Sequence, residues 1–191
     1  MTRVVIRKPV LLVAALLLAG CATPSQQPEL TRLHNQVGKL NGEMRQLTQQ
    51  ATALTRQNRL NTNSTQGAWL MPAANTAVVL KSQAGDVRLS LSQVSGEANG
   101  TRAILNIRPA GENPLPAFTV QVEWGEIDPT TGQPLQVDSQ SQSITVAGSL
   151  LPRNEVTVPL RLSNIVPEQV GFVRVHDLVV QTPAQSANQS G

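Results

Sequence analysis

Few residues of this 191-residue chain are of types that carry out chemistry. It contains two histidines, His34 and His176, and Asp177 directly follows the second. Neighbouring residues of a strand point to opposite faces, so we expect any acid partner of His176 to come from elsewhere. The sequence has no Gly-x-Ser-x-Gly nucleophile elbow and no Gly-rich phosphate loop with a lysine. We therefore predict that His176 is an ordinary strand residue.

Two carboxylates, Glu123 and Glu126, flank Trp124 and Gly125. Paired acids perform glycoside hydrolysis when their separation is suitable. Solvated charges near a strand end are the simpler interpretation, because one aromatic side chain makes a poor sugar cleft. His34 has no second ligand three or four residues along, and the sequence has neither a zinc-type Cys/His cluster nor a calcium-type acidic loop. We expect no catalytic residue, no metal site and no cofactor.

The one cysteine, Cys21, follows an N-terminal segment with the features of an export signal. Three basic residues precede an apolar run over 10–18, and the small residues Ala19 and Gly20 follow it. That run is too short to span a bilayer, which takes about 20 residues. We therefore predict that residues 1–20 are a removable signal peptide and not a transmembrane helix.

The tetrapeptide Leu18-Ala19-Gly20-Cys21 resembles the signal of bacterial lipoproteins. The resemblance implies that Cys21 carries a diacylglyceryl group on its thiol and a third acyl chain on its amine. Since stable anchoring takes about two chains, three would make membrane association effectively permanent. The residue after the cysteine is Ala22 and not the Asp that favours inner-membrane retention, which implies the outer membrane facing the periplasm. An ordinary buried cysteine is the alternative.

The composition of the chain after residue 20 excludes several classes of partner. The full sequence has 15 basic and 12 acidic residues, and three of the basic ones lie in residues 1–20. The remainder is nearly neutral, which removes the electrostatic argument for nucleic acid. Two Trp, two Phe and no Tyr leave little for stacking sugars or bases, so the core must be aliphatic. With Cys21 lipidated, no disulfide forms within the chain.

A heptad pattern occupies residues 29–61, after a small, polar tether over 21–28. Apolar residues recur at two positions of each heptad, which is typical of a coiled-coil seam. The predicted association seam is Leu30, Leu33, Val37, Leu40, Met44, Leu47, Ala51 and Leu54. The flanking e and g positions carry little charge; they are His34, Asn41, Thr48, Thr55, Gln36, Glu43, Gln50 and Gln57.

The alternative is an amphipathic helix folded onto the following domain. A globular face normally uses about three positions in seven, so the narrow stripe favours association with another helix. Gly38 and Gly42 each cost about 1 kcal/mol relative to Ala, so the helix alone is marginal and depends on local concentration at the membrane.

From residue 69 the apolar period changes to two, after a turn-rich joint over 62–68. Alternation predicts strands near 77–81, 87–91, 103–107, 118–124, 144–146, 156–162 and 173–176, separated by Gly-, Asn- and Pro-containing turns. Seven or eight short strands indicate an antiparallel β-sandwich over 69–181. Pro159 lacks an N–H, so its strand should be an edge. Residues 182–191 are small and polar, and we expect a disordered tail.

Four stretches resemble the YajI-like family of bacterial lipoproteins. They are Gly100–Ala103, Leu115–Thr119, Val122–Gly125 and Gly171–Asp177. The likeness runs over the lipoprotein signal, the heptad helix and the β domain, and it implies an envelope lipoprotein without adding a mechanism. The helix is also loosely similar to the coiled coil of the major outer-membrane lipoprotein. That protein ends in a lysine linked to peptidoglycan, whereas this chain ends in Gln189-Ser190-Gly191.

Three classes of function follow. The first is a structural or interaction lipoprotein, whose helix associates with itself or with an envelope protein and displays the β domain. The second is a module that binds a cell-envelope ligand, such as peptidoglycan or protein, with the helix as spacer. An enzyme is the least favoured, because no nucleophile, metal site or acid–base pair stands out.

Overall fold

The computed structural model describes residues 27–62, 64–135 and 137–181. Cys21, the signal peptide, residues 21–26 of the predicted tether and the predicted tail lie outside these residues, whereas Gln27 and Pro28, which were assigned to the tether, lie in the first turn of the helix. The chain divides into two compact units, residues 1–44 and 45–191. Helix α1, Gln27–Asn61, contributes residues to both units.

Helix α1 follows from local sequence signals. No proline occurs between Pro28 and Pro72, and Pro28 lies in the first turn, where its missing N–H has no helical partner to lose. Glu29 in the first turn and Arg59 in the last complement the helix dipole. Within residues 29–44 of the first unit, every side chain is exposed.

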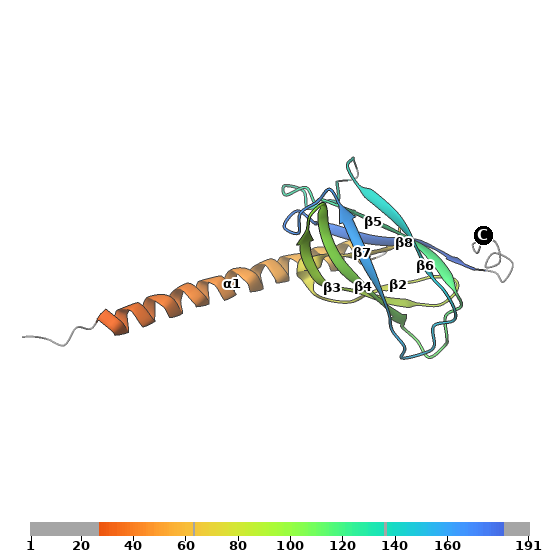
Figure 1. The fold of residues 1–191 in the computed structure, drawn as a ribbon, viewed down its shortest axis with the longest axis horizontal. Helices are drawn as coiled ribbons and strands as arrows, with labels where there is room; N and C mark the ends of the chain where they lie inside the picture. Colours follow the sequence, from red (N-terminus) through yellow and green to blue (C-terminus); the bar gives the residue numbers. More distant parts are fainter. Residues whose placement is uncertain (1–26, 63, 136, 182–191) are drawn as a thin grey trace, which may run out of the picture. The chain divides into compact units, whose positions relative to one another are not determined.

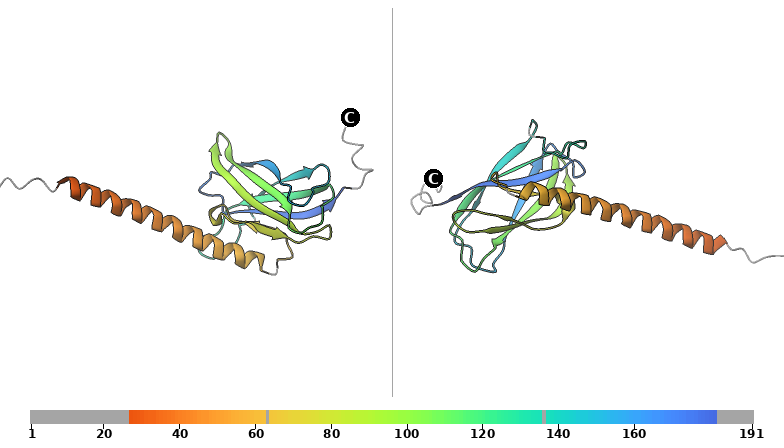
Figure 2. Two further views of the ribbon diagram at one scale, coloured as in Figure 1. Left: turned by 90° about the horizontal axis from the view of Figure 1, so that it is seen from below. Right: turned by 180° about the vertical axis from the view of Figure 1, so that it is seen from behind.

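The second unit contains two four-stranded sheets, and all strand pairs are antiparallel. The first sheet has the order β1 (Ala68–Leu70), β8 (Phe172–Val180), β5 (Phe118–Gly125) and β6 (Gln140–Val146). The second has the order β2 (Val78–Leu80), β3 (Val87–Glu97), β4 (Gly100–Pro109) and β7 (Val156–Ser163). Figures 1 and 2 show the sheets stacked face to face. The predicted mainly β fold, a sandwich preceded by one helix, is confirmed.

The core lies between the two sheets and is mainly aliphatic. Val120 and Val122 of β5 face Leu105 and Ile107 of β4 across one cluster of buried residues. Alternation along each strand brings these side chains to the inner face and leaves polar ones outside. Pro159 lies in β7, an edge strand, as its missing N–H predicted.

Residues 45–61 of α1 pack on the β domain through a second, smaller cluster. Ala53 is buried with Met71 and Ala74, and Leu54, Leu60 and Ile127 pack against them. Residues 72–74 form a short 3-10 helix beside this contact. The last turns of α1 therefore belong to the β domain. For these turns, the alternative prediction of a helix folded onto the domain describes the structure.

Two side-chain amides of α1 cover the open edge of β1. Asn61 donates to the carbonyl of Trp69 at 2.7 Å and accepts from the Trp69 N–H at 2.9 Å. Gln57 is fully buried; it accepts from the Met71 N–H at 2.8 Å and donates to the Thr76 carbonyl at 3.4 Å. An exposed strand edge is a template for aggregation, and these amides occupy it.

Candidate functional site

A cluster of charged side chains lies on the outer face of the first sheet. Glu123 of β5 is paired in register with Arg174 of β8, so the two side chains share that face. The Arg174 Nη2 lies 2.9 Å from the Glu123 Oε2, and the two side chains are 16% and 13% exposed. Because water is largely excluded, each charge depends on the other.

Aromatic rings support the arginine. The guanidinium carbon of Arg174 lies 5.1 Å from the centroid of the Trp69 ring, which is a cation–π distance. Trp69 in turn contacts Phe172, with ring centroids 5.2 Å apart at 58°. Arg174 Nε is buried and has no hydrogen-bond partner among the residues described. The aromatic pair and Glu123 therefore fix the guanidinium.

His176 and Asp177 lie on the same face, which corrects the sequence-based expectation. The His176 Nδ1 is 2.9 Å from the Asp177 Oδ2, although the two residues are adjacent in a strand. The pairing of β5 with β8 shifts between Thr119 and Gln121, and Asp177 has a φ of 50°. This bulge places one extra residue in β8 and re-aims the Asp177 side chain. The expectation of opposite faces was wrong because it assumed unbroken alternation.

The imidazole thus lies between two carboxylates. Its other nitrogen, Nε2, is 3.9 Å from the Glu123 Oε2, so Glu123 faces both Arg174 and His176. Such a pair can orient an imidazole for proton transfer. Ser82, a serine that lines the cleft described next, donates its hydroxyl proton to the Gly85 carbonyl at 2.6 Å. Its proton is therefore directed away from the histidine.

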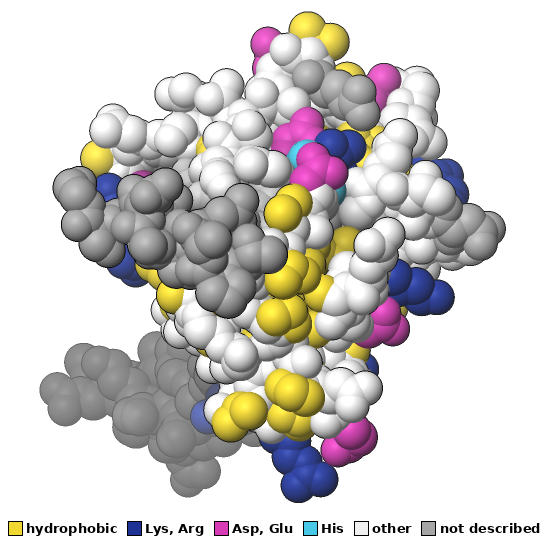
Figure 3. Space-filling model, turned by 90° about the vertical axis from the view of Figure 1, so that its right-hand side faces the viewer, with side chains coloured by type: hydrophobic (Ala, Val, Ile, Leu, Met, Phe, Trp, Pro, Cys, Tyr) yellow, Lys and Arg dark blue, Asp and Glu magenta, His cyan; other side chains and the backbone are white. Residues whose placement is uncertain are grey.

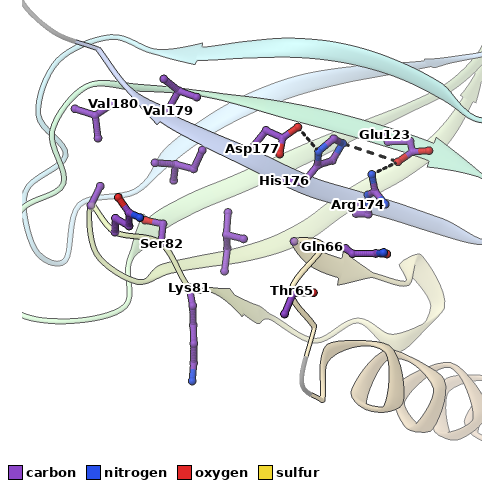
Figure 4. A pocket seen from close by; sticks show the side chains of 15 residues that line it. Thr65, Gln66, Lys81, Ser82, Glu123, Arg174, His176, Asp177, Val179 and Val180 are labelled. Carbon is purple, nitrogen blue, oxygen red and sulfur yellow. Dashed lines mark ion pairs between the residues drawn. The ribbon is translucent and has the colours of Figure 1, made fainter.

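The cluster lines a cleft of about 990 Å³. One wall is β8 from Arg174 to Val180, and the other is the segment 80–84 that joins β2 to β3. Residues 65–67 close one end. In Figure 4, Glu123, Arg174, His176 and Asp177 point toward one another, while Lys81 points away from them. Figure 3 shows a histidine beside acidic and basic side chains on this face, with hydrophobic side chains below.

The predicted association seam has two parts in the structure. Six of its side chains are 49–65% exposed: Leu30, Leu33, Val37, Leu40, Met44 and Leu47. Ala51 is also exposed, whereas Leu54 is half-buried against the cluster around Ala53. The last apolar residue of the heptad pattern therefore packs on this chain's own β domain.

Gln57 is the residue that the heptad pattern placed least well. The pattern assigns it to a flanking g position, yet its side chain is fully buried. Its Oε1 accepts from Met71, which directly follows β1, and the Asn61 amide bonds to Trp69 of β1; the spacing of four residues puts both amides on one helix face. Hydrophobic periodicity does not detect such a contact, because both residues are polar.

The remaining candidate residues stay apart. Glu126 is exposed beyond the end of β5, while Glu123 is held by Arg174, so the two acids do not form one site. His34 is exposed on α1. Within 27–62, 64–135 and 137–181, no three His, Cys, Asp or Glu residues are grouped so as to hold a metal ion. Across the same ranges, α1 included, no helix is long and apolar enough to cross a membrane.

Fold and site together define a helix-plus-sandwich protein with a polar cleft at the edge of one sheet. Residues 21–186 match the family model described as protein of unknown function DUF3251, and the chain belongs to this family. It is 39% identical over 161 residues to the uncharacterised lipoprotein YajI of Escherichia coli (strain K12). The match covers 84% of this chain and 88% of that protein. The predicted resemblance to the YajI-like family is confirmed.

Solved structures agree with the fold. The solution NMR structure of the E. coli lipoprotein YajI matches with a TM-score of 0.65 at 36% identity, over 75% of this chain and 85% of that one. The trimeric lipoprotein SadB of Salmonella enterica matches with a TM-score of 0.52 at 15% identity, over 82% of this chain and 84% of that one. The second likeness extends to the fold alone.

Proposed function

We propose that the chain is a lipid-anchored outer-membrane lipoprotein that faces the periplasm and acts by association rather than catalysis. In this proposal Cys21 carries the lipid, and the apolar stripe of α1 binds other copies of the chain or a helix of an envelope protein. The family of lipoproteins to which the chain belongs supports the anchor. The assembly then displays the β domain.

The exposed stripe on α1 is the observation that carries the proposal. Its six large apolar side chains are 49–65% exposed. Burying each such side chain contributes roughly 1.5–3 kcal/mol of favourable free energy. A helix that leaves all six in water lacks this contribution. A partner helix placed on the stripe recovers it. Because the lipoprotein SadB, which shares the fold, is trimeric, a trimer is the first stoichiometry to test.

The stripe and the domain-facing side of α1 do not compete. At 100° per residue, the mean direction of Ala53 and Gln57 lies about 130° around the helix from the mean direction of Met44, Leu47 and Ala51. Ala53 and Gln57 are buried, while Leu47 is 64% exposed. We expect the association to run from Leu30 to Leu47 or Ala51, and to end where Leu54 packs on the β domain.

Photo-crosslinking in intact cells tests this proposal. A photo-reactive residue placed at Asn41, next to the stripe, should give a product at a multiple of the chain's own mass if the coil is homotypic. A product with a second protein would identify a partner helix. The same residue at Asn35, an exposed position on the far side of the helix, is the matched control. Crosslinks that are equal at both positions would refute association through the stripe.

A second candidate function is a module that binds an envelope ligand. The cleft beside Glu123, Arg174, His176 and Asp177 favours it. Retention of the full chain on purified peptidoglycan, competed by soluble fragments, would support this function. Retention that is unchanged in a chain with Arg174→Met and Asp177→Asn would show that the cleft is not responsible.

A further inference from the structure

Strand β8 is longer than the edge strand beside it. β1 pairs with β8 only from Val173 to Val175, whereas β8 continues to Val180. In the described part of the chain, no strand pairs with β8 beyond Val175 on the side of β1. The other side of β8 remains paired with β5 as far as Val180. A four-residue length of strand edge, 177–180, is therefore open.

Gly67 lies opposite this point, directly before the first residue of β1. Its φ is 104°, and a Cβ at this position would lie 2.4 Å from the Val175 carbonyl oxygen and 2.6 Å from the His176 Cβ. Only glycine fits such a conformation and approach. The chain therefore comes up to β8 at Gly67 and enters β1, and it leaves the later part of β8 uncovered.

Main-chain hydrogen bonds to β5 show which way the open residues of β8 face. The Gln181 N–H donates to the Ala117 carbonyl at 2.8 Å, on the β5 side, and Val179 is paired with Thr119 of β5. Alternate residues of an antiparallel strand direct their main-chain groups to opposite neighbours. The N–H and C=O of Val180, between them, are thus presented to the open edge, which is the side of the cleft.

The side chains around this edge suit a peptide better than a charged small molecule. The Glu123 carboxylate is paired with the Arg174 guanidinium, and the Asp177 carboxylate contacts the His176 ring, so each of these groups already has a partner within the cluster. Beyond it the cleft is lined by Leu80, Leu178, Val179 and Val180, and the last two are 60% and 38% exposed. What remains unmatched is peptide main chain flanked by apolar side chains.

We infer that this cleft binds an extended peptide segment of another protein, which adds as a strand next to residues 177–180 of β8. Main-chain hydrogen bonds supply the affinity in this mode of recognition, and alternate side chains supply the specificity. The open length is about 13 Å at 3.3 Å per residue, which accommodates roughly four residues of the guest strand. The guest carries apolar or β-branched residues at alternate positions, toward Leu178 and Val180.

The test uses the full chain in detergent micelles and a random dodecapeptide library displayed on phage. Enriched sequences should show apolar alternation, and the corresponding synthetic peptides should bind in solution. In an added strand only every second N–H of the peptide faces β8, so methylating single backbone nitrogens of the best peptide should weaken binding at least tenfold at alternate positions only. A contact made by side chains would not show this alternation.

A pair of variants keeps the inference falsifiable on the protein side. Val180→Pro removes the outward N–H without touching the β5 ladder, and we expect at least tenfold weaker binding of the selected peptide. Val180→Ala keeps the N–H and should stay within threefold. Equal binding to Val180→Pro, or no enrichment at all, would overturn the inference. Peptide binding that appears only after residues 182–191 are removed would also overturn it, because the chain's own end would then be the occupant. A dimer of the chain that Val180→Pro abolishes would do the same, because a second copy would then be the occupant. These readouts do not depend on the helix stripe.

Discussion

Asp177 shows how one residue shapes the cleft. It is 73% exposed as a side chain and has a φ of 50°, in the left-handed region that costs most L-residues free energy. Asp and Asn tolerate this conformation better than other non-glycine residues. The contact with His176 offsets this conformational cost. The resulting bulge places the side chains of His176 and Asp177 together in the lining of the cleft.

A β-branched residue at this bulge should be poorly tolerated. We expect Asp177→Val to lower the free energy of unfolding by about 1–3 kcal/mol, because Val resists a left-handed backbone. Asp177→Asn keeps the conformational tolerance and should stay within about 1 kcal/mol of the parent chain. Urea unfolding of the three proteins measures the difference, and equal losses for Val and Asn would show that charge, not conformation, matters here.

Asp128 gives a residue-scale prediction about pH. The backbone N–H groups of Thr131, at 3.1 Å, and Thr130, at 2.7 Å, donate to its Oδ1 and hold the pKa of Asp128 below its ordinary value. A lowered folded-state pKa means that the carboxylate stabilises the fold above about pH 4. That contribution is lost as the pH falls through the lower value in the folded state.

The stability difference between the parent chain and Asp128→Ala should therefore narrow as the pH is lowered from about 7 to about 2.5. Asp128→Asn is the control, because it keeps an acceptor oxygen for the turn and has no charge to titrate. Urea unfolding at several pH values gives the comparison. If the difference in free energy of unfolding between the parent chain and Asp128→Ala stayed constant with pH, the stabilisation would not come from the charge of the Asp128 carboxylate.

At the scale of elements, helix and strands differ in how far the sequence predicts them. The long strands follow from alternation of apolar residues, and Pro159 correctly marks β7 as an edge. Strand β1 does not follow, because its three residues, Ala68, Trp69 and Leu70, are all buried and carry no period. The bulge at Asp177 and the docking of Gln57 also escape local patterns, since both depend on neighbours distant in sequence.

The docking of α1 on β1 depends strongly on Gln57. We expect Gln57→Ala to destabilise the β domain by about 2–4 kcal/mol, because the change leaves the Met71 N–H without its acceptor and opens a cavity. Asn58→Ala, at the exposed neighbouring position, should change stability by less than about 0.5 kcal/mol. Thermal or urea unfolding distinguishes the two, and similar effects would mean that helix propensity dominates.

At the scale of the whole molecule, the proposed function divides the chain into parts for anchoring, association and display. In this proposal the signal and Cys21 serve anchoring, the exposed stripe of α1 serves association and the sandwich is displayed. The family model matches residues 21–186, so Cys21, α1 and the sandwich fall within one family match. The sequence alone suggests this division, since lipid attachment and heptads are local patterns, and the roles of Cys21 and of the stripe stay predictions. It predicts the cleft poorly, because a cleft arises from the ends of several strands.

Charge on the stripe should disperse the assembly and leave the fold intact. We expect the double change Leu33→Lys and Leu40→Lys to reduce the sedimenting mass of the detergent-solubilised protein to that of one chain, because buried seam lysines are strongly disfavoured. The control carries lysines at Asn35 and Gln49, two exposed positions on the far side of the helix from the stripe. Unfolding of the β domain should be unchanged in both, and an oligomer that survives the seam lysines would contradict the proposed coil.

The amide contact between α1 and β1 has a consequence for spectroscopy. The Trp69 and Met71 backbone protons are held by side chains of a helix, not by a neighbouring strand. Their exchange with deuterium should therefore follow release of the last helical turns rather than opening of the sheet. Two resonances would then report continuously on whether the helix is docked, even while the rest of the sandwich stays protected.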